Sequence, residues 1–251
     1  MLDKIVESCR YLLNNFPEAQ ECRDYLNSRI NEESQERFQF GFFPKIHDLS
    51  ALTSLVGEDI LKETKLIYTK DISDSYSPRS LNFCFFDQHP LIMPYKDAYG
   101  RTVALVGRTI LSENEREKSK IAKYKNTVFQ KRNYLFGLNE SKQNILEQDC
   151  VYIVEGQLDV IKSIESGFRN VVGLGNSNMT YYQFSIINRY TNNIFLLLDN
   201  DEAGEKGRKR ISKLFGQYAN IRNFYLPDPY KDIDEYLSKN SYESLSFVVR
   251  D

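Results

Sequence analysis

The sequence of 251 residues has no C-x-x-C pair and no apolar run that approaches about 20 residues. Its cysteines stand singly, as Cys9, Cys22, Cys84 and Cys150. Zinc ribbons and fingers are therefore excluded, no zinc is expected, and a disulfide framework finds no support. Because charged residues interrupt the apolar ones from the start, the N-terminus predicts an amphipathic helix, not a secretory signal. We expect a protein of the reducing cytoplasm that neither spans nor binds a membrane.

Further absences narrow the chemistry. His47 and His89 have no Cys or His partner at the spacing of metal ligands, so both are expected to be structural. Residues 173–175 (G-L-G) lack the third glycine of a dinucleotide-binding fingerprint, and no G-x-x-x-x-G-K-[ST] motif occurs. The sequence therefore argues against an attached helicase or another P-loop ATPase.

Composition places the chain among ordinary soluble proteins, with 41% hydrophobic and 27% charged residues. A net charge of −2 and a pI near 5.9 would not by themselves indicate a nucleic-acid-binding protein. The charge is segregated, however: residues 101–132 contain nine Lys and Arg against three Glu, an excess of six positive charges. A basic face beside an acidic one favours a protein that holds a polyanion in one place and metal-bound phosphate in another.

Two kinds of organisation follow one another along the chain. The first part predicts helices over residues 1–38 (broken at Pro17) and 49–66, strands at 91–94 and 103–106 joined by a hairpin, and polar loops at 71–80 and 112–120. From Cys150 onward the sequence predicts strands at 151–154, 170–173, 194–199 and 221–226, separated by helices at 158–166, 180–189 and 203–215.

This alternation indicates right-handed βαβ units and hence a parallel sheet flanked by helices. The predicted fold class is α/β, with the parallel sheet preceded by a mixed α+β basic subdomain. We therefore expect an N-terminal domain at 1–148, a catalytic domain at 149–228 and a short acidic segment at 229–251 that completes the site.

Acidic residues directly follow two of the predicted strands. Glu155 comes after the run at 151–154, and Asp199 and Asp201 come after the run at 194–198. The carboxyl ends of parallel strands border the crevice in which open α/β sheets hold ligands. Asp199 and Asp201, two apart in an extended chain, are expected to point the same way, and converging like charges favour a bound divalent cation. The pattern predicts metal-dependent phosphate chemistry.

A simpler interpretation is open for two of the acids. Asp159 and Asp201 stand where a side chain can cap the helix that follows a strand, and each could do only that. Gly156 permits a sharp turn and the close approach of a ligand to the backbone. Taken singly, each pairing of strand and acid favours a cap, whereas the joint pattern favours a site.

The acidic motifs resemble those of one family. Residues 155–161 (E-G-Q-L-D-V-I) and 199–204 (D-N-D-E-A-G) resemble the E-G-x-x-D-V-I and D-x-D-x-A-G motifs of the Toprim domain in bacterial-type, DnaG-like DNA primases. Residues 173–176 stand where those primases carry a G-T stretch, with Asn in place of Thr. Residues 226–237 are similar to the family's L-P-x-G-K-D-P-D-E-x-L segment, with Ile233 in place of its Pro.

The resemblance continues upstream in the family's order. Residues 25–29 and 37–42 are similar to the Y-L-x-x-R and R-F-x-I-G-Y elements that open the primase polymerase region. Residues 100–108 resemble G-R-V-x-G-F-x-G-R, and residues 123–126 and 129–138 resemble K-Y-L-N-S and F-x-K-x-x-x-L-Y-G-L. Because the ordered set covers nearly the whole chain, it is far more specific than any single piece.

The resemblance implies a nucleotidyltransferase, a DNA-dependent RNA polymerase that makes short RNA primers on single-stranded DNA from ribonucleoside triphosphates. It implies two divalent ions, Mg²⁺ or Mn²⁺, with catalytic residues Glu155, Asp199 and Asp201. The implied metal ligands are Asp199, Asp201 and Asp232, supported by Asp159 and Asp234, with Glu155 as ligand or proton acceptor. The implied nucleic-acid-binding or nucleotide-binding residues are Arg101, Arg108, Lys123, Tyr124, Lys125, Asn126 and Lys131.

Two modules of the family have no counterpart in these residues. Bacterial primases usually begin with a zinc-ribbon module and end with a helical module that docks the replicative helicase. The resemblance therefore predicts a minimal core, phage-encoded or split, which would act in the host cytoplasm if viral. The replicative helicase is kept as a partner, although the docking module is absent.

Several alternatives stay open. Residues 115–120 are most simply a solvated loop or helix face of mixed charge, and Tyr124 could be a core tyrosine instead of a ring that stacks a base. The chain could also be another Toprim enzyme, a metal-dependent nuclease or topoisomerase, or an inactive protein that binds single-stranded DNA or a replisome partner. The upstream half argues against the former, and the intact carboxylates argue against the latter.

Overall fold

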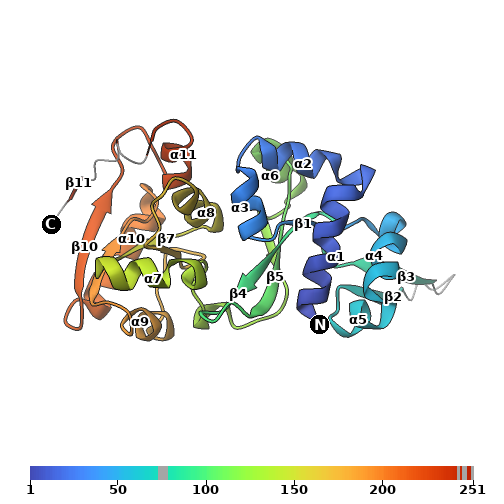
Figure 1. The fold of residues 1–251 in the computed structure, drawn as a ribbon, viewed down its shortest axis with the longest axis horizontal. Coiled ribbons are helices and arrows are strands. Elements are labelled where there is room, and N and C mark those ends of the chain that lie inside the picture. Colours follow the sequence, from blue (N-terminus) through green and yellow to red (C-terminus); the bar gives the residue numbers. More distant parts are fainter. Residues whose placement is uncertain (73–78, 242–243, 245–247, 250–251) are drawn as a thin grey trace. The chain divides into compact units, whose positions relative to one another are not determined.

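The computed structural model describes residues 1–72, 79–241, 244 and 248–249. The chain divides into two compact units, Met1–Tyr95 with Thr102–Phe129, and Lys96–Arg101 with Gln130–Asp251 (Figure 1). This division comes earlier than the predicted boundary near residue 148, because helix α7 (Leu138–Gln148) belongs to the second unit, where it packs against strand β8 (Val171–Gly173). No helix among the described residues is long and apolar enough to cross a membrane.

The first unit is rich in short helices. Its helical elements are α1 (Leu2–Asn15), η1 (Pro17–Ala19), α2 (Gln20–Asn27), α3 (Glu32–Arg37), η2 (Ile46–Asp48), α4 (Leu49–Val56), α5 (Glu58–Glu63) and α6 (Glu113–Ser119). The predicted break at Pro17 is confirmed, because proline has no N–H for the helix interior but suits the first position of a new turn. Gly57 splits the second predicted helical stretch, and its φ of +97° is one that residues with side chains rarely adopt.

The strands of the first unit form two sheets. A four-stranded sheet has the order β1 (Gly41–Phe42), β4 (Leu91–Lys96), β5 (Thr102–Arg108) and β6 (Tyr124–Asn126), and a separate antiparallel pair consists of β2 (Ile67–Ile72) and β3 (Arg79–Cys84). Helix α1 packs so closely on β1 that a Cβ added to Gly41 would lie 2.6 Å from the Cβ of Cys9. The antiparallel pairing of β5 with β6 places Tyr124 opposite Arg108.

Two predicted loops of this unit differ from the structure. Residues 113–119 form helix α6, because Ser112 and Glu115 make a capping box in which the Glu115 carboxylate accepts the Ser112 N–H at 2.9 Å. The helix-face interpretation of residues 115–120 therefore fits better than the loop. Of the loop predicted at 71–80, residues 71–72 belong to β2 and residues 79–80 belong to β3. Residues 73–78 lie outside the described part of the chain.

The second unit is the predicted α/β sheet. Besides α7 and β8 it contains η3 (Lys131–Asn133), β7 (Val151–Val154), α8 (Gln157–Glu165), α9 (Tyr181–Ile187), β9 (Asn193–Leu196), α10 (Glu202–Phe215), β10 (Asn220–Tyr225), α11 (Ile233–Leu237) and β11 (Val248–Val249). The strand order is β11-β10-β9-β7-β8, in which β8, β7, β9 and β10 are parallel and β11 is an antiparallel edge strand. The prediction of a parallel sheet flanked by helices is confirmed.

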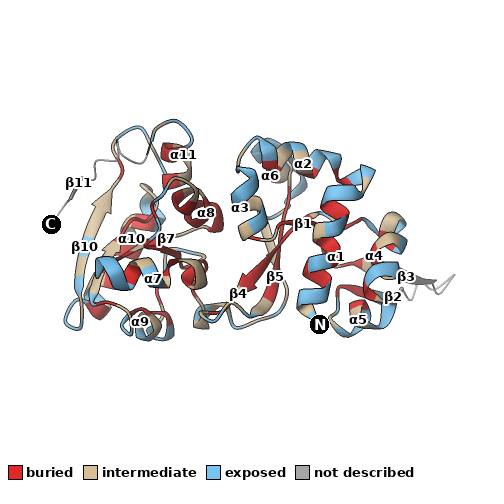
Figure 2. Ribbon diagram, viewed as in Figure 1, coloured by how far each residue is buried: buried red, intermediate tan, exposed pale blue. Residues whose placement is uncertain are grey.

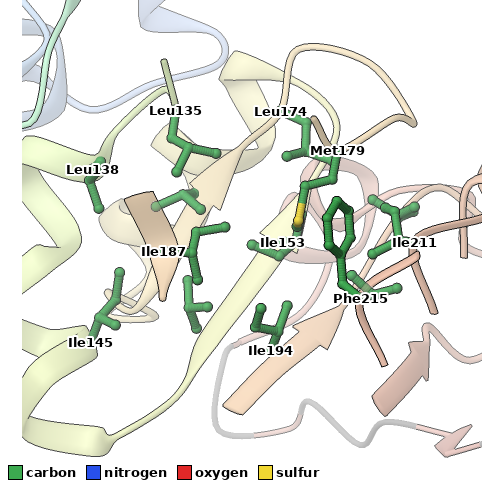
Figure 3. Packing of buried hydrophobic residues seen from close by; sticks show 14 residues of the cluster. Leu135, Leu138, Ile145, Ile153, Leu174, Met179, Ile187, Ile194, Ile211 and Phe215 are labelled. Atoms are coloured by element: carbon green, nitrogen blue, oxygen red, sulfur yellow. The ribbon is translucent and has the colours of Figure 1, made fainter. Parts of the chain in front are cut away.

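Side chains of the central strands alternate between a buried face and a partly buried face. Figure 2 colours the ribbon by the burial of each residue. On one face, Ile153 and Ile194 pack with Phe215 of α10 and with side chains of α7 and α9 in one apolar cluster (Figure 3). On the other, the ring of Phe195 lies 5.1 Å from that of Tyr152 and 5.0 Å from that of Phe224. Because apolar or aromatic side chains lie on both faces, these strands form continuous apolar runs in the sequence.

Candidate functional site

All six predicted acidic site residues lie in the second unit, beyond the carboxyl ends of its parallel strands. Glu155 follows β7, and Asp159 lies in the first turn of α8. Asp199 and Asp201 lie between β9 and α10, and Asp232 and Asp234 lie at the start of α11. Strand β9 ends at Leu196, so the strand predicted at 194–199 ends three residues earlier than expected and Asp199 lies in the link to helix α10. Asp201 begins helix α10. That Asp199 and Asp201 point the same way stays a prediction.

Glu155 and Asp199 bring the two acidic motifs together, although 44 residues separate them. The backbone N–H of Asp199 donates a hydrogen bond of 3.3 Å to Oε1 of Glu155. Burial, followed by the charges of Asp199 and Asp201, raises the pKa of Glu155 to about 7, while the Asp199 N–H and the charge of Arg208 act in the opposite direction. The protonation of Glu155 therefore changes near neutral pH.

Asp159 is buried at the start of helix α8. Its Oδ2 accepts the Gly156 N–H at 2.7 Å, and a Cβ added to Gly156 would lie 2.7 Å from the same oxygen, so glycine leaves the room that this cap needs. Burial raises the pKa of Asp159 to about 8, and the charges of Asp232 and Asp199 add to the shift. Asp159 thus both caps its helix and faces the other acids.

Asp201 and Asp232 are the N-caps of α10 and α11. Asp201 accepts the Gly204 N–H at 3.0 Å and pairs with the ammonium of Lys231 at 3.1 Å. The Gly204 N–H, followed by Lys231, holds the pKa of Asp201 below its usual value. Asp232 accepts a backbone N–H of α11 at 2.8 Å. The N-cap interpretation is confirmed for Asp201, whereas Asp159 is the third residue of α8 and accepts the N–H of the N-cap Gly156. Both roles leave further carboxylate lone pairs for a ligand.

Asn200 joins the two acidic segments and was not predicted as a site residue. Its backbone N–H donates to the carbonyl of Lys231 at 2.7 Å. Its side-chain amide donates to the carbonyls of Leu226 and Tyr230 at 3.0 and 3.1 Å. The segment that leads to Asp232 is thereby tied to the segment that carries Asp199, and the position of Asn200 between two acids is the only sequence signal of this role.

Arg208 of α10 is a second residue that sequence reasoning missed. It is 1% exposed and donates to the carbonyls of Asp199 at 3.0 Å, Phe224 at 3.4 Å and Leu198. Its guanidinium lies 4.2 Å from the ring centroid of Tyr225. Because Arg208 falls on the buried stripe of α10, a charged residue inside the apolar period is the signal that could have found it.

The acidic donor set fits a divalent cation by its chemistry. Carboxylate oxygens are the ligands that Mg²⁺ and Mn²⁺ prefer. The pKa values of Glu155 and Asp159 are raised first by burial and then by neighbouring carboxylates, whose repulsion a cation would relieve. In the described part of the chain, no three His, Cys, Asp or Glu side chains are grouped so that they could hold one ion. Asp159 and Asp201 direct oxygens to backbone N–H groups, and the ligand set stays a prediction.

Five predicted nucleic-acid-binding residues lie on or beside β5 and β6 of the first unit: Arg108, Lys123, Tyr124, Lys125 and Asn126. Arg108 is 6% exposed, and its Nε donates to the hydroxyl of Tyr25 at 2.8 Å. The guanidinium of Arg108 lies 4.9 Å from the ring centroid of Tyr124, and the ammonium of the exposed Lys123 lies 5.9 Å from it. Tyr124 is half-buried, so it is neither a fully buried core residue nor an open ring.

The two remaining predicted binding residues, Arg101 and Lys131, lie in the second unit. Arg101 pairs with Asp97 at 2.7 Å in the turn between β4 and β5. The ammonium of Lys131 donates to the carbonyl of Gly175 at 2.9 Å, and burial lowers the pKa of Lys131. The structure therefore divides the predicted binding residues between the two units.

Known families match the chain in two successive segments. Residues 10–142 match the family described as DNA primase catalytic core, N-terminal domain. Residues 152–237 match the Toprim-like family. The order of these two matches is the order predicted from the motifs.

Individual primases are similar over nearly all of the chain. The chain is 30% identical over 99% of its length to the DNA primase of Aquifex aeolicus, of which it covers 48%. It resembles the Escherichia coli primase catalytic core with a TM-score of 0.76 at 25% identity, over 95% of this chain and 75% of that one. A DnaG primase catalytic domain bound to single-stranded DNA shares the fold, with a TM-score of 0.75 at 24% identity over 97% of this chain and 77% of that one.

The chain spans about half the length of its Aquifex relative. The predicted fold and family are confirmed, and the phage origin stays a prediction. Because the family of the primase catalytic core matches more than half of the chain and a Toprim-like segment follows it, the chain belongs to the DnaG-type DNA primases.

Proposed function

We propose that the chain is the polymerase core of a DNA primase, which joins ribonucleoside triphosphates into short RNA primers on single-stranded DNA. The observation that carries the proposal is the hydrogen bond between Glu155 and Asp199, which joins the two acidic Toprim motifs at one end of the parallel sheet. Membership of the primase family supports the reaction. The replicative helicase is the proposed partner.

The acidic residues are proposed to hold metal and substrate. Two divalent ions, Mg²⁺ or Mn²⁺, would supply charge to neutralise the triphosphate and to lower the pKa of the primer 3′-hydroxyl. Asp199, Asp201 and Asp232 would hold them, with Asp159 and Asp234 in support. Such chemistry depends on positioning and charge neutralisation, so it needs no covalent nucleophile.

Glu155 is proposed as a ligand or as the acceptor of the 3′-hydroxyl proton. Its pKa of about 7 supports the second role, because a carboxyl that titrates near the working pH can take up and release a proton in each turnover. The partial burial that raises this pKa also reduces the contact of the carboxyl with water.

The basic residues are proposed to hold the template or the triphosphate. The exposed ammonium of Lys123 would contact phosphate, while Tyr124, with the guanidinium of Arg108 against its ring, would stack a base. Lys131 and Arg101 would act from the second unit, and Lys131 would exchange the Gly175 carbonyl for a phosphate oxygen. The segment 1–148 would grip the polyanion, 149–228 would carry the catalysis, and 229–251 would complete the site with Asp232.

Incorporation of labelled ribonucleotides on single-stranded DNA, in Mg²⁺ or Mn²⁺ and with or without a chelator, tests the proposal. Short metal-dependent RNA products are expected, lost in Asp199→Ala and kept in Glu202→Ala, whose exposed carboxylate pairs with Lys206 on the same helix. Undiminished synthesis by a folded Asp199→Ala protein would overturn the metal assignment.

The same reaction separates the alternatives. Cleavage of a preformed strand without triphosphates would identify a Toprim nuclease or topoisomerase. Metal-independent binding of single-stranded DNA with no turnover would identify a binding protein.

A further inference from the structure

Arg208 has the largest side chain among the fully buried residues that the structure describes. A guanidinium keeps its charge inside proteins, and burying it is costly unless its donors find acceptors. Here Nη1 and Nη2 find main-chain carbonyls at the ends of two neighbouring strands, whereas Nε has no acceptor among the described residues. Nη1 donates to Asp199, and Nη2 donates to Leu198 beyond β9 and to Phe224 of β10. One planar group thus joins both strand ends to helix α10.

These contacts fix the backbone on both sides of Asp199. In the peptide group before its Cα, the Leu198 carbonyl binds Arg208 and the Asp199 N–H binds Glu155. In the peptide group after it, the Asp199 carbonyl binds Arg208 and the Asn200 N–H binds the carbonyl of Lys231. Since a peptide group is planar, holding both groups fixes φ and ψ of Asp199 and hence the direction of its Cα–Cβ bond.

The surroundings of Arg208 hold its guanidinium in one orientation. The ring of Tyr225 lies 4.2 Å from it, and the Tyr225 hydroxyl donates to Glu205 at 2.9 Å. A Cβ added to Gly204 would lie 2.1 Å from the Asp199 carbonyl oxygen and 3.2 Å from Nη1 of Arg208. The helix therefore has a glycine where the carbonyl and the guanidinium meet.

We propose that Arg208 is a positioning residue, which holds the backbone of Asp199 so that its carboxylate is aimed at the metal-binding region before any ion arrives. This role rests on the proposed function of the acidic site. A planar fork can bind two adjacent carbonyls at once, whereas a lysine ammonium is a single point of charge. The geometry at Asp199 thus depends on the shape of the Arg208 side chain as well as on its charge.

Arg208→Lys tests the role, because it keeps the charge and removes the fork. The matched control is Arg210→Lys on the exposed face of the same helix. Mn²⁺ binding to the protein alone, measured by electron paramagnetic resonance without nucleotide or DNA, should weaken about tenfold or more in Arg208→Lys and stay unchanged in the control. Primer synthesis should fall and should partly recover at raised Mn²⁺.

Circular dichroism and thermal unfolding separate this role from a merely structural one. A folded Arg208→Lys protein with a lowered Tm and the Mn²⁺ affinity of the unchanged protein would overturn the proposal. If Arg208→Lys does not fold, Tyr225→Leu provides the second test, because it keeps the fork and frees its orientation. A folded Tyr225→Leu protein with full Mn²⁺ affinity would likewise overturn it.

The binding measurement also distinguishes the two proposals. If the unsubstituted protein binds Mn²⁺ but makes no RNA, primer synthesis is refuted. The Mn²⁺ affinity of Arg208→Lys relative to that of the unsubstituted protein would still decide the role of Arg208. An unchanged protein that binds no Mn²⁺ would overturn the role of Arg208.

Discussion

The acidic and basic groups of predicted site residues are held by different kinds of contact. In the second unit, the Asp199 backbone is fixed by hydrogen bonds to Glu155 and Arg208. In the first unit, cations lie against rings: the guanidinium of Arg108 is 4.9 Å from the Tyr124 centroid, and the ammonium of Lys125 is 4.2 Å from that of Phe85. A hydrogen bond weakens steeply when it is bent, whereas a cation can move over a ring at small cost.

This difference predicts two kinds of response to substitution. The acidic group should fail sharply when one carboxyl or one of its tethers is changed, because the parts share one backbone geometry. The basic group should weaken by increments, since each cation contributes separately to binding a polyanion.

The largest effect is expected for Glu155→Gln. Glutamine keeps the size of the side chain and an oxygen that can accept the Asp199 N–H, but it can neither take up a proton nor supply a charged ligand. Primer synthesis should fall by about a hundredfold or more while Tm stays within a few degrees. Glu147→Gln, at an exposed position of α7, is the control. Normal synthesis by the folded Glu155→Gln protein would remove this residue from the site.

The acidic group should also make the metal-free protein less stable as the pH rises. The folded-state pKa values of Glu155 and Asp159, about 7 and about 8, lie above the ordinary values of 4.5 and 3.8. The folded state therefore binds protons more tightly than the unfolded state, and stability is lost as the pH rises from about 4 through about 8. With a chelator present, the unfolding free energy should decrease by on the order of a few kcal/mol between pH 5 and pH 8. Tm should fall over the same range.

Asp159→Asn sharpens this test. The asparagine can still accept the Gly156 N–H, but it has no proton to lose, so the decline of Tm with pH should become shallower. Added Mn²⁺ should raise Tm more at pH 8 than at pH 5. If Tm falls with pH as steeply in Asp159→Asn as in the unsubstituted protein, Asp159 does not titrate in this range.

A smaller loss is expected for Asn200→Ala. The substitution leaves the carbonyls of Leu226 and Tyr230 without the side-chain donor and should cost about 1–2 kcal/mol of unfolding free energy. Hydrogen exchange should quicken at residues 226–232 more than in the central strands. Asn188→Ala, at an exposed position after α9, should change neither quantity. Uniform exchange rates across the second unit would contradict the idea of a local clamp.

The smallest effect is expected in the basic group. Lys123→Ala should weaken binding of single-stranded DNA several-fold and reduce the slope of log affinity against log salt by about one contact. Lys118→Ala, on the exposed face of α6, should leave both unchanged. Equal affinity and slope in Lys123→Ala would make this segment a solvated face with no part in binding.

The parallel sheet was predictable from the sequence because its central strands carry apolar side chains on both faces. The apolar run predicted as a strand at 151–154 is found as β7, Val151–Val154, and the acids beyond β7 and β9 lie at the expected edge. Helix α6 was missed although Ser112 and Glu115 carry a capping-box signal, because the segment has no apolar stripe to mark a helix.

The place of Arg208 on the buried stripe of α10 could have marked this residue, but the contacts of the site's tethers were beyond sequence reasoning for a different reason. Arg208 was one basic residue among several on its helix, and its acceptors are carbonyls, which every residue possesses. The contact between Lys131 and the Gly175 carbonyl is of the same kind. Patterns of side chains identify reactive groups, but a bond to the main chain leaves no such pattern.

Asn200 also constrains how this chain can change in length. Its hydrogen bonds reach Leu226, Tyr230 and Lys231, so the loop between them has a fixed span. An inserted or deleted residue there would break at least one of these bonds and shift Asp232 away from Asp159, whose pKa its charge raises. We therefore expect insertions and deletions among close relatives to avoid residues 226–231, even where the amino acids of this loop vary.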